Sequence, residues 1–183
     1  MPKKPSDQDV LAFWFTETPP EFWFKKDAEF DARIADQFAR TVKDALAGKC
    51  DHWANDSAGC LALILVLDQF TRNIFRGSAR AFSGDDMALA LSSRCVERDY
   101  INHSDENWRR FMLMPMMHSE DLNIQEASLP LFQAHTDKLT YEYAVAHRDI
   151  IARFGRFPHR NIILGRPSSD EERLFLSQPG SSF

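Results

Sequence analysis

The sequence lacks the short motifs that mark a nucleotide site or a serine nucleophile. None of the patterns G-x-G-x-x-G, G-x-x-x-x-G-K-[ST] and G-x-S-x-G occurs in the 183 residues. The chain therefore carries no local signature of a Rossmann site, a P-loop or an α/β-hydrolase.

Cysteine and histidine are too scattered for a disulfide framework or a common metal motif. The three cysteines, Cys50, Cys60 and Cys95, are odd in number and form no C-x-x-C pair. No H-x-x-x-H pattern occurs, and His118 and Glu120, two positions apart, do not share a helix face. We expect no metal ion and no cofactor, and free thiols fit a reducing cytoplasm.

Long apolar runs are also missing. The longest covers eight residues, 60–67, whereas about 20 are needed to span a bilayer. The first ten residues, MPKKPSDQDV, lack the apolar core of a signal peptide. Hydrophobic residues make up 44% of the chain and charged residues 27%, which is typical of a globular protein. We expect one cytoplasmic domain over residues 1–183, with no membrane segment.

Helical signals dominate what is present. The segment 27–47 has apolar residues at helical spacing before Gly48, and the run LALILVLDQF predicts a buried helix at 57–75. Further helices are expected at 79–99, 104–129 with a break or kink near Pro115, 137–155, 158–164 and 169–177, the last capped by Ser168 or Ser169. The aromatic residues around Trp14 and Trp23 are expected in the core. No strand alternation is convincing, so the predicted fold class is all-α, in a single compact domain.

Positive charge is concentrated in two windows of a chain whose net charge is −5. The intervals 69–84 and 150–169 contain several arginines and no acidic residue. Pro158 suits the first position of a helix that Phe157 cannot cap, so free N–H groups and guanidinium groups would lie within one turn. This predicts a site for phosphate or carboxylate. The predicted ligand-binding residues are Arg72, Asn73, Arg76, Arg156, His159, Arg160 and Asn161.

A structural role for the same arginines stays open. They would then pair with acidic residues from other helices, and a distant carboxylate such as Asp68 or Glu120 would take the place of the anion. Arg-Asn-Ile occurs in both windows, at 72–74 and 160–162. On this basis we expect Arg72 and Arg76 to meet the segment 156–161 in space.

Polar residues interrupt two predicted apolar stripes. His118 and Gln125 lie in the stripe along 111–129, and His147 lies in the stripe along 139–154. A buried polar group must be hydrogen bonded, and several of them together would form a polar pocket. For any single histidine, a satisfied core position is the simpler interpretation. The predicted pocket residues are Asp68, Gln69, His118, Glu120, Gln125 and His147.

Six distinctive blocks are spread along the chain: VLAFWF, FWFKKDAEFD, LALILVLDQFTRNIFRG, AFSGDDMAL, FMLMPMMHSED and IIARFGRFPHRNIILGR. From Val10 to Leu176, they resemble a bacterial protein family known only as a domain of unknown function. The resemblance implies antiparallel helix pairs related to the tetratricopeptide-like superhelices, although the tetratricopeptide consensus itself does not match. It implies no activity. Thr71 stands where the family more often has proline, which allows the helix to continue there.

Two functions remain open. The first, favoured because no catalytic spacing is visible, is binding of an anionic small molecule or acidic peptide in an arginine-lined groove. The second is an enzyme for a phosphate- or carboxylate-bearing substrate, with proton transfer by His118, Glu120 or His147 and a clamp of Arg156 and Arg160. Histidines within about 4 Å of the arginines in a closed pocket would favour the enzyme. The acidic total charge argues against nucleic acid, and the sequence does not predict an oligomeric state.

Overall fold

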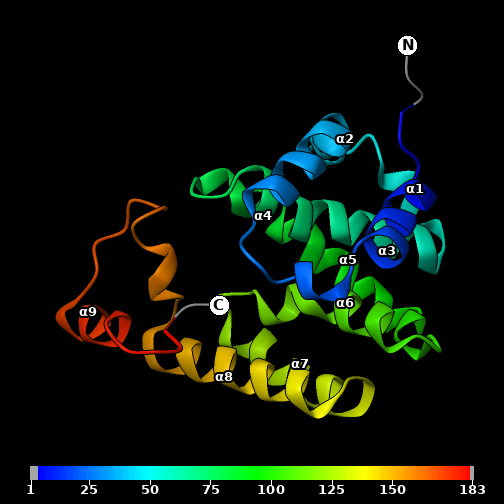
Figure 1. Ribbon diagram of the computed structural model, residues 1–183. Coiled ribbons are helices and arrows are strands. Elements are labelled where there is room, and N and C mark those ends of the chain that lie inside the picture. The colour runs from blue at the N-terminus through cyan, green and yellow to red at the C-terminus, as the bar shows by residue number, and fades with distance from the viewer. Residues whose placement is uncertain (1–3, 182–183) are drawn as a thin grey trace.

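Residues 4–181 are described by the computed structural model, and they form helices joined by turns, without any strand. The α-helices are α1 (Asp7–Ala12), α2 (Ala28–Leu46), α3 (Ser57–Ile64), α4 (Thr71–Ile74), α5 (Asp85–Glu97), α6 (Glu106–Met117), α7 (Leu122–His135), α8 (Lys138–Phe154) and α9 (Asp170–Leu176) (Figure 1). Two π-helical segments, Phe13–Glu17 and Leu65–Phe70, continue α1 and α3, and 3₁₀ turns occur at Pro20–Phe22, Asp51–Asn55, Ala79–Phe82, Tyr100–Asn102 and Pro158–Arg160. The predicted all-α class is confirmed. Within the described residues, no helix is long and apolar enough to cross a bilayer.

Side-chain caps place several helix ends where the sequence predicts them. Asp27 begins α2 by accepting hydrogen bonds from two backbone N–H groups of the first turn. Ser169 and Glu172 form a reciprocal capping box at α9. Gly155 ends α8 in the left-handed conformation, with a φ of 67°. The helices predicted at 27–47, 137–155 and 169–177 are therefore confirmed.

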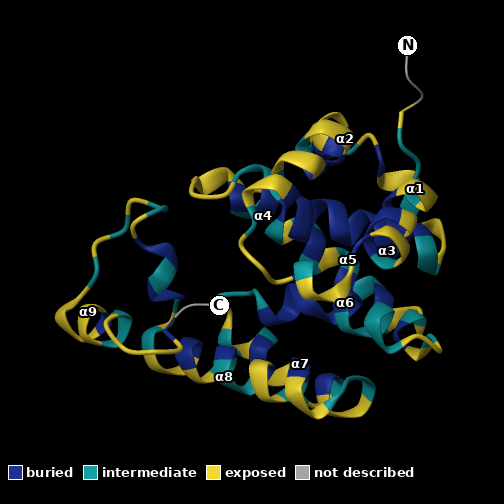
Figure 2. Ribbon diagram, viewed as in Figure 1, coloured by how far each residue is buried: buried dark blue, intermediate teal, exposed yellow. Residues whose placement is uncertain are grey.

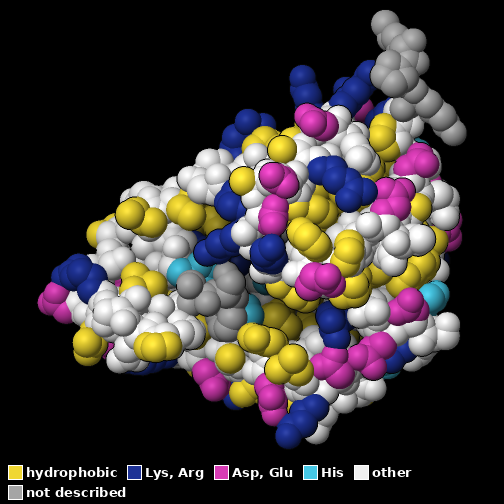
Figure 3. All heavy atoms as spheres, viewed as in Figure 1, with side chains coloured by type: hydrophobic (Ala, Val, Ile, Leu, Met, Phe, Trp, Pro, Cys, Tyr) yellow, Lys and Arg dark blue, Asp and Glu magenta, His cyan; other side chains and the backbone are white. Residues whose placement is uncertain are grey.

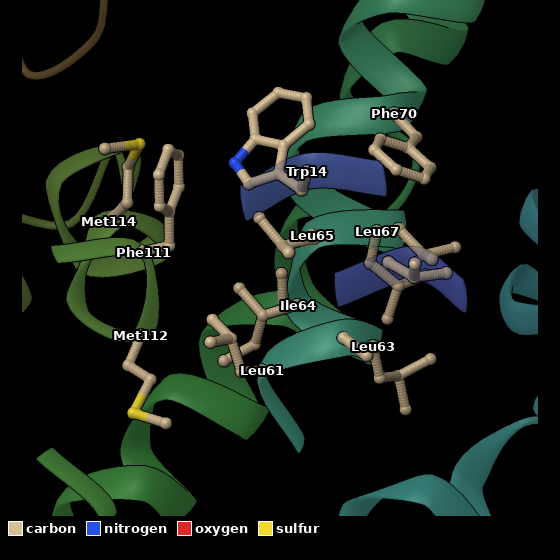
Figure 4. Close-up of a cluster of buried hydrophobic side chains, with 14 of the residues drawn as sticks. Trp14, Leu61, Leu63, Ile64, Leu65, Leu67, Phe70, Phe111, Met112 and Met114 are labelled. Carbon is tan, nitrogen blue, oxygen red and sulfur yellow. The ribbon is translucent and has the colours of Figure 1, made fainter. Parts of the chain in front are cut away.

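The largest apolar core surrounds α3 and the π-helical segment that follows it. Every residue from Gly59 to Phe70 is buried, as the run LALILVLDQF predicts (Figure 2). Trp14 lies between Phe70 and Phe111, with ring centroids 5.6 Å apart on either side (Figure 4). The indole N–H of Trp23 donates to the backbone carbonyl of Trp14 at 3.0 Å. The predicted core position of the two tryptophans is confirmed.

A second, smaller apolar cluster lies at the end of α8. Ile150, Ile151 and Phe157 are buried there, and Leu122, Phe154 and Phe175 pack against them. We call these six residues the satellite cluster. They come from the region around α7, α8 and α9, along the lower and left edges of the molecule in Figure 1. The last part of the chain, residues 153–181, is called the C-terminal segment below.

Gly84 divides the helix predicted at 79–99. A 3₁₀ turn at Ala79–Phe82 comes first, and α5 begins only at Asp85. A Cβ atom at position 84 would lie 2.3 Å from the carbonyl oxygen of Leu67. Only glycine therefore lets the start of α5 lie directly on the π-helical segment, and this close packing brings Asp85 to Arg72.

The helix predicted at 104–129 is two helices. Pro115 lies inside α6, which continues to Met117, and His118 is its C-cap. A short loop then leads to Asp121, whose side chain caps α7. The prediction of one apolar stripe along 111–129 is wrong, because the helix ends at His118. The break places His118 and Glu120 in a loop between helices.

Two further predictions need correction. The stripe along 139–154 is buried only in its second half, since Leu139 and Tyr143 are 61% and 50% exposed and lie before the satellite cluster. The helix predicted at 158–164 is only a 3₁₀ turn at Pro158–Arg160. The N–H of Arg166 turns back to the carbonyl of Asn161 at 2.8 Å. A three-residue turn is too short for a helix dipole that binds an anion.

Candidate functional site

The centre of the candidate site is a hydrogen bond between a buried carboxylate and a histidine. Asp68 lies in the π-helical segment Leu65–Phe70, and its side chain is 1% exposed. Nδ1 of His118, at the end of α6, lies 2.7 Å from Oδ1 of Asp68. Segments of π-helix inserted into α-helices are frequent at functional sites. The two residues are 50 positions apart in the sequence, and the packing of α3 against α6 brings them together.

Neighbouring charges keep Asp68 ionised. Burial alone would raise the pKa of Asp68, but the charges of Arg72 and His118 hold it well below its usual range. Gln69 Nε2 also donates to Oδ2, at 2.6 Å. Because an ionised carboxylate only accepts hydrogen bonds, Nδ1 of His118 carries a proton. When the ring is neutral, Nε2 is therefore the acceptor. Asp68 and His118 thus form an acid–base dyad.

A second carboxylate, Asp85, lies on the other side of Arg72. The terminal nitrogens of Arg72 donate to its two oxygens at 2.9 and 3.1 Å, and Nη1 also lies 3.2 Å from Oδ1 of Asp68. At Asp85 the effect of burial dominates and raises the pKa, although the charge of Arg72 opposes it. Two carboxylates that share one guanidinium therefore have pKa values shifted in opposite directions, a pattern found at acid–base sites.

Arg160 reaches this cluster from the C-terminal segment. Its guanidinium lies 4.6 Å from the ring centroids of two phenylalanines, and its side chain is 8% exposed. Nη2 donates to the backbone carbonyl of His118 at 3.0 Å, and Nη1 lies 3.5 Å from Oδ2 of Asp85. Nε has no hydrogen-bond partner among residues 4–181. Burial and the charge of Arg72 lower the pKa of Arg160 to about 10, so the guanidinium is charged but incompletely paired.

Two adjoining cavities lie beside the cluster. The smaller one, which we call the chamber, has a volume of about 150 Å³ and is lined by Asp85, Asp86, Leu89, Pro115, His118, Ser119, Glu120 and Arg160. The larger one, which we call the trough, has a volume of about 830 Å³ and shares Asp86, Leu89, Ser119 and Glu120 with the chamber. On the face drawn in Figure 3, histidine side chains come to the surface between the part that carries α9 and the other helices, beside lysine or arginine side chains.

Glu120 connects the C-terminal segment to the loop after His118. It accepts hydrogen bonds from the two terminal nitrogens of Arg166 at 2.7 and 3.0 Å, and from the backbone N–H of Phe157 at 2.8 Å. Burial raises the pKa of Glu120, but these donors outweigh it and lower the pKa. Glu120 therefore accepts a hydrogen bond at the start of the segment FPHRN, where the sequence predicts an anion. This contact agrees with the alternative, structural role left open in the sequence analysis.

Four other predicted ligand-binding residues are paired away from the chamber. Asn73 and Arg76 both donate to Asp31 of α2, Arg76 at 2.5 and 2.8 Å. Arg156 donates to both carboxylate oxygens of Glu172, at 2.7 and 2.8 Å. Asn161 accepts a hydrogen bond from Arg166 and donates one to Ser168. The amide of Gln125, predicted for the pocket, donates to the backbone carbonyls of Met117 and Ser119 and so supports the loop around His118.

Two more histidines lie close to the dyad. The ring of His147 is 6.3 Å from that of His118, and its Nδ1 lies 2.7 Å from the carbonyl of Tyr143. Burial and the charge of His118 lower the pKa of His147 to about 3. Burial and the charge of Arg160 lower the pKa of His159 to about 4. Both rings are neutral at pH 7, so neither attracts an anion by charge.

The structure brings together part of the predicted set. Asp68, Gln69, Arg72, His118, Glu120 and Arg160 gather around the chamber and its walls. The expected meeting of the two Arg-Asn-Ile motifs is confirmed for Arg72, which shares Asp85 with Arg160, and it is wrong for Arg76. Sequence reasoning missed Asp85 and Arg166. The one signal for Asp85 was a glycine directly before an acidic pair, in GDDMAL.

These observations define an all-helical protein with an acid–base cluster where its C-terminal segment meets the main core. The chain belongs to a family of bacterial proteins of unknown function (DUF924), whose model matches residues 10–180. It is similar to a solved protein of unknown function from Agrobacterium tumefaciens, with 38% sequence identity and a TM-score of 0.88 over 93% of this chain and 96% of that chain. No curated protein matches. Within residues 4–181, no group of three or more His, Cys, Asp or Glu side chains is placed to hold a metal ion.

Proposed function

We propose that the protein is an enzyme in which His118 transfers a proton to or from a small anionic substrate bound in the chamber. The observation that carries this proposal is the Asp68–His118 hydrogen bond of 2.7 Å at a residue that lines a cavity. A histidine whose Nδ1–H is bound by a carboxylate presents Nε2 as a base. The imidazolium formed when Nε2 takes a proton is stabilised by the ionised Asp68.

Asp85 has a different role in this proposal. Its pKa is raised while that of Asp68 is lowered, so it is the carboxyl group of the cluster that takes up a proton more readily. Asp85 lines the chamber together with His118. A protonatable carboxyl group and a base that face one cavity can act as acid and base on the same substrate.

Arg160 is the group that would hold the anionic part of the substrate. It lines the chamber, and its closest carboxylate oxygen is 3.5 Å away, longer than a normal charge-assisted hydrogen bond. A phosphate or carboxylate in the chamber would offer this guanidinium a better acceptor. Nη2 of Arg160 bonds to the carbonyl of His118, so the base and the anchor are held at a fixed separation.

Binding without catalysis is supported less well. The groove that the sequence predicts requires several arginines free for a ligand. Arg72, Arg76 and Arg156 each donate two hydrogen bonds to one carboxylate, and a ligand would have to displace that carboxylate. The tetratricopeptide-like relation of the helices and a cytoplasmic location stay predictions from the sequence.

The proposal is tested with wild-type protein, His118→Gln and, as a control, His52→Gln, because His52 is exposed. Each protein is screened for turnover of chromogenic phosphate esters, carboxylate-bearing esters and carboxylate-bearing amides. We expect a compound that the wild type and the control convert, with conversion lowered about 10²- to 10⁴-fold in His118→Gln. Equal conversion by all three proteins would contradict the proposal, as would a nitrogen NMR spectrum in which Nδ1 of neutral His118 carries no proton.

A further inference from the structure

We infer that the substrate of the proposed enzyme carries a protonated amine on an apolar body, and that this part lies in the trough beside the chamber. The inference rests on the proposed function for the position of the reacting end. The chemistry of the rest of the substrate is inferred from the residues that line the trough, which have no role in the proposed proton transfer.

The trough has an apolar lining with an acidic rim. Leu89, Leu122, Ile124 and Ile151 supply the apolar side chains, and Ile151 also belongs to the satellite cluster. The trough is an open depression with a volume of about 830 Å³, so a small molecule bound in it would stay partly exposed to solvent. An apolar substrate part that covers these side chains gains hydrophobic stabilisation.

The charge of the rim is negative. Glu120 is neutralised by Arg166, whereas Asp86 and Asp121 are exposed and form no ion pair with any residue of 4–181. They come from different elements, because Asp86 lies in the first turn of α5 and Asp121 caps α7. An ammonium group in the trough would be attracted by both carboxylates, and an anionic group would be repelled.

The chamber supplies an independent indication that a ligand binds here. Arg160 is a wall of the chamber, with a side chain 8% exposed, a buried Nε without a partner among the described residues and one ion pair at 3.5 Å. Buried guanidinium groups are normally fully paired, so this one lacks an acceptor. The chamber and the trough share four lining residues, and one molecule can therefore extend from Arg160 to the acidic rim.

The inference separates the two ends of the substrate by charge. The end that reacts bears the acceptor for Arg160, and the far end bears the cation. A substrate with anionic groups at both ends is disfavoured in the trough, although it would suit an arginine-lined groove. This charge order can be tested with simple amphiphiles that contain only the far end.

The experiment measures binding of octylamine, octanoate and octan-1-ol to the full chain at neutral pH and low salt, by calorimetry below the micelle concentration. We expect octylamine to bind more tightly than octan-1-ol, the uncharged control. Octanoate can bind with its carboxylate at Arg160, and its binding should not weaken when Asp86 or Asp121 is changed. Asp86→Asn and Asp121→Asn should each weaken octylamine about two- to fivefold, and both changes together about tenfold. Asparagine keeps the helix cap at position 121. Glu126→Gln, an exposed position on α7 outside the trough lining, is the matched control and should bind like the wild type.

Octan-1-ol binding as tight as octylamine binding, or octylamine binding unchanged in the double variant, would overturn the inference. Failure of the proposed function looks different. The variant His118→Gln should bind octylamine like the wild type and lose turnover. If octylamine binding depends on Asp86 and Asp121 while turnover does not depend on His118, the trough is assigned correctly and the acid–base role is wrong.

Discussion

The aromatic core and the C-terminal segment are stabilised by different interactions. Around Trp14 the core consists of large side chains with little or no exposure, such as Phe13, Phe70 and Phe111. The C-terminal segment has one such aromatic residue, Phe157, and is otherwise held by arginine–carboxylate pairs: Arg153–Glu171, Arg156–Glu172, Arg160–Asp85 and Arg166–Glu120. Apolar burial depends little on pH or salt, whereas ion pairs depend on both.

The difference matters for the site, because the site uses residues from both parts. Asp68 belongs to the helix that the aromatic core surrounds, and Arg160 belongs to the C-terminal segment. Conditions that weaken the ion pairs should therefore loosen the anchor for the substrate while the dyad stays in place. The predictions below test this contrast, beginning with the largest expected effect.

Trp14→Ala should cause the largest loss of stability. Trp14 is fully buried and contacts the rings of Trp23, Phe70 and Phe111, so truncation leaves a cavity and is expected to cost about 3–5 kcal/mol. Urea unfolding followed by circular dichroism measures it. Phe24→Ala, at a residue 62% exposed, is the control and should cost less than about 1 kcal/mol. A loss of that small size at Trp14 would remove the basis for calling this region the main core.

Glu120→Gln should have a smaller and more local effect. The change leaves Arg166 without its carboxylate and weakens the acceptor for the N–H of Phe157. We expect a loss of about 1–3 kcal/mol, below the value for a fully buried pair because both side chains are partly exposed. Cleavage by trypsin after Arg156 should also become faster, because the backbone at Phe157 is held less firmly. Glu126→Gln is the matched control, and equal cleavage rates in the two variants would show that Glu120 does not hold the segment.

Acidification should destabilise the region around the C-terminal segment at a higher pH than it destabilises the aromatic core. The pKa values of His147 and His159 are lowered to about 3 and 4 by burial, with His118 and Arg160 as the nearby positive groups. An unfolded histidine has a pKa near 6.5. Above that pH both histidines are neutral in the folded and in the unfolded chain, so they do not lower the free energy of unfolding. As the pH falls from about 6.5 toward 4, the unfolded chain binds protons that the folded chain does not, and the free energy of unfolding decreases.

The variant His147→Gln removes one of these titrations. Between pH 6.5 and 5, its free energy of unfolding should decrease by about 1–2 kcal/mol less than that of the wild type. Urea unfolding at pH 7.5, 6.5, 5.5 and 5 gives the slope, and His52→Gln is the exposed control. Parallel pH profiles for wild type and His147→Gln would mean that His147 is protonated as easily in the folded chain as in the unfolded one.

The sequence predicts the fold class and several helix ends because these depend on local features. Helical spacing, the carboxylate of Asp27, the capping box of Ser169 and the glycine at position 155 all act within one or two turns. The end of α6 after Met117 does not depend on such local features alone. Pro115 suggests an interruption nearby, but the helix continues past it and ends at His118, where the packing against neighbouring helices decides the boundary.

Some residues of the candidate site could be predicted from the sequence, but Asp85 and the pairing of the charged groups could not. Asp68, His118 and Arg160 are recognisable because each is a polar group in an apolar or basic setting. Which carboxylate meets which arginine depends on tertiary packing, above all on the close approach of Gly84 to Leu67 that brings Asp85 to Arg72. Two intervals without acids suggested free arginines, but the acids that pair with Arg72, Arg160 and Arg166 come from outside those intervals.

The smallest effect is expected at Arg153. Its Nε lies 2.9 Å from Oε1 of Glu171, but the side chains are 49% and 60% exposed, so solvent already compensates both charges. Arg153→Ala should change the free energy of unfolding by less than about 1 kcal/mol. Part of that loss comes from the contact of the guanidinium with the ring of Phe154, at 4.7 Å from the centroid, so Arg153→Gln separates the loss of charge from the loss of packing.

Arg156 provides the matched comparison for Arg153. It lies three residues later and pairs with the neighbouring residue of α9, Glu172, whose side chain is 3% exposed. Arg156→Ala leaves that carboxylate buried without its guanidinium, and the cost should be measurably larger than at Arg153. Urea unfolding of the two variants at 0.05 M and 0.5 M salt makes the comparison sharper, because salt should weaken the exposed pair more. Equal losses and equal salt dependence would mean that the burial of an ion pair does not determine how much it stabilises the C-terminal segment. Its contrast with the aromatic core would then lose its physical basis.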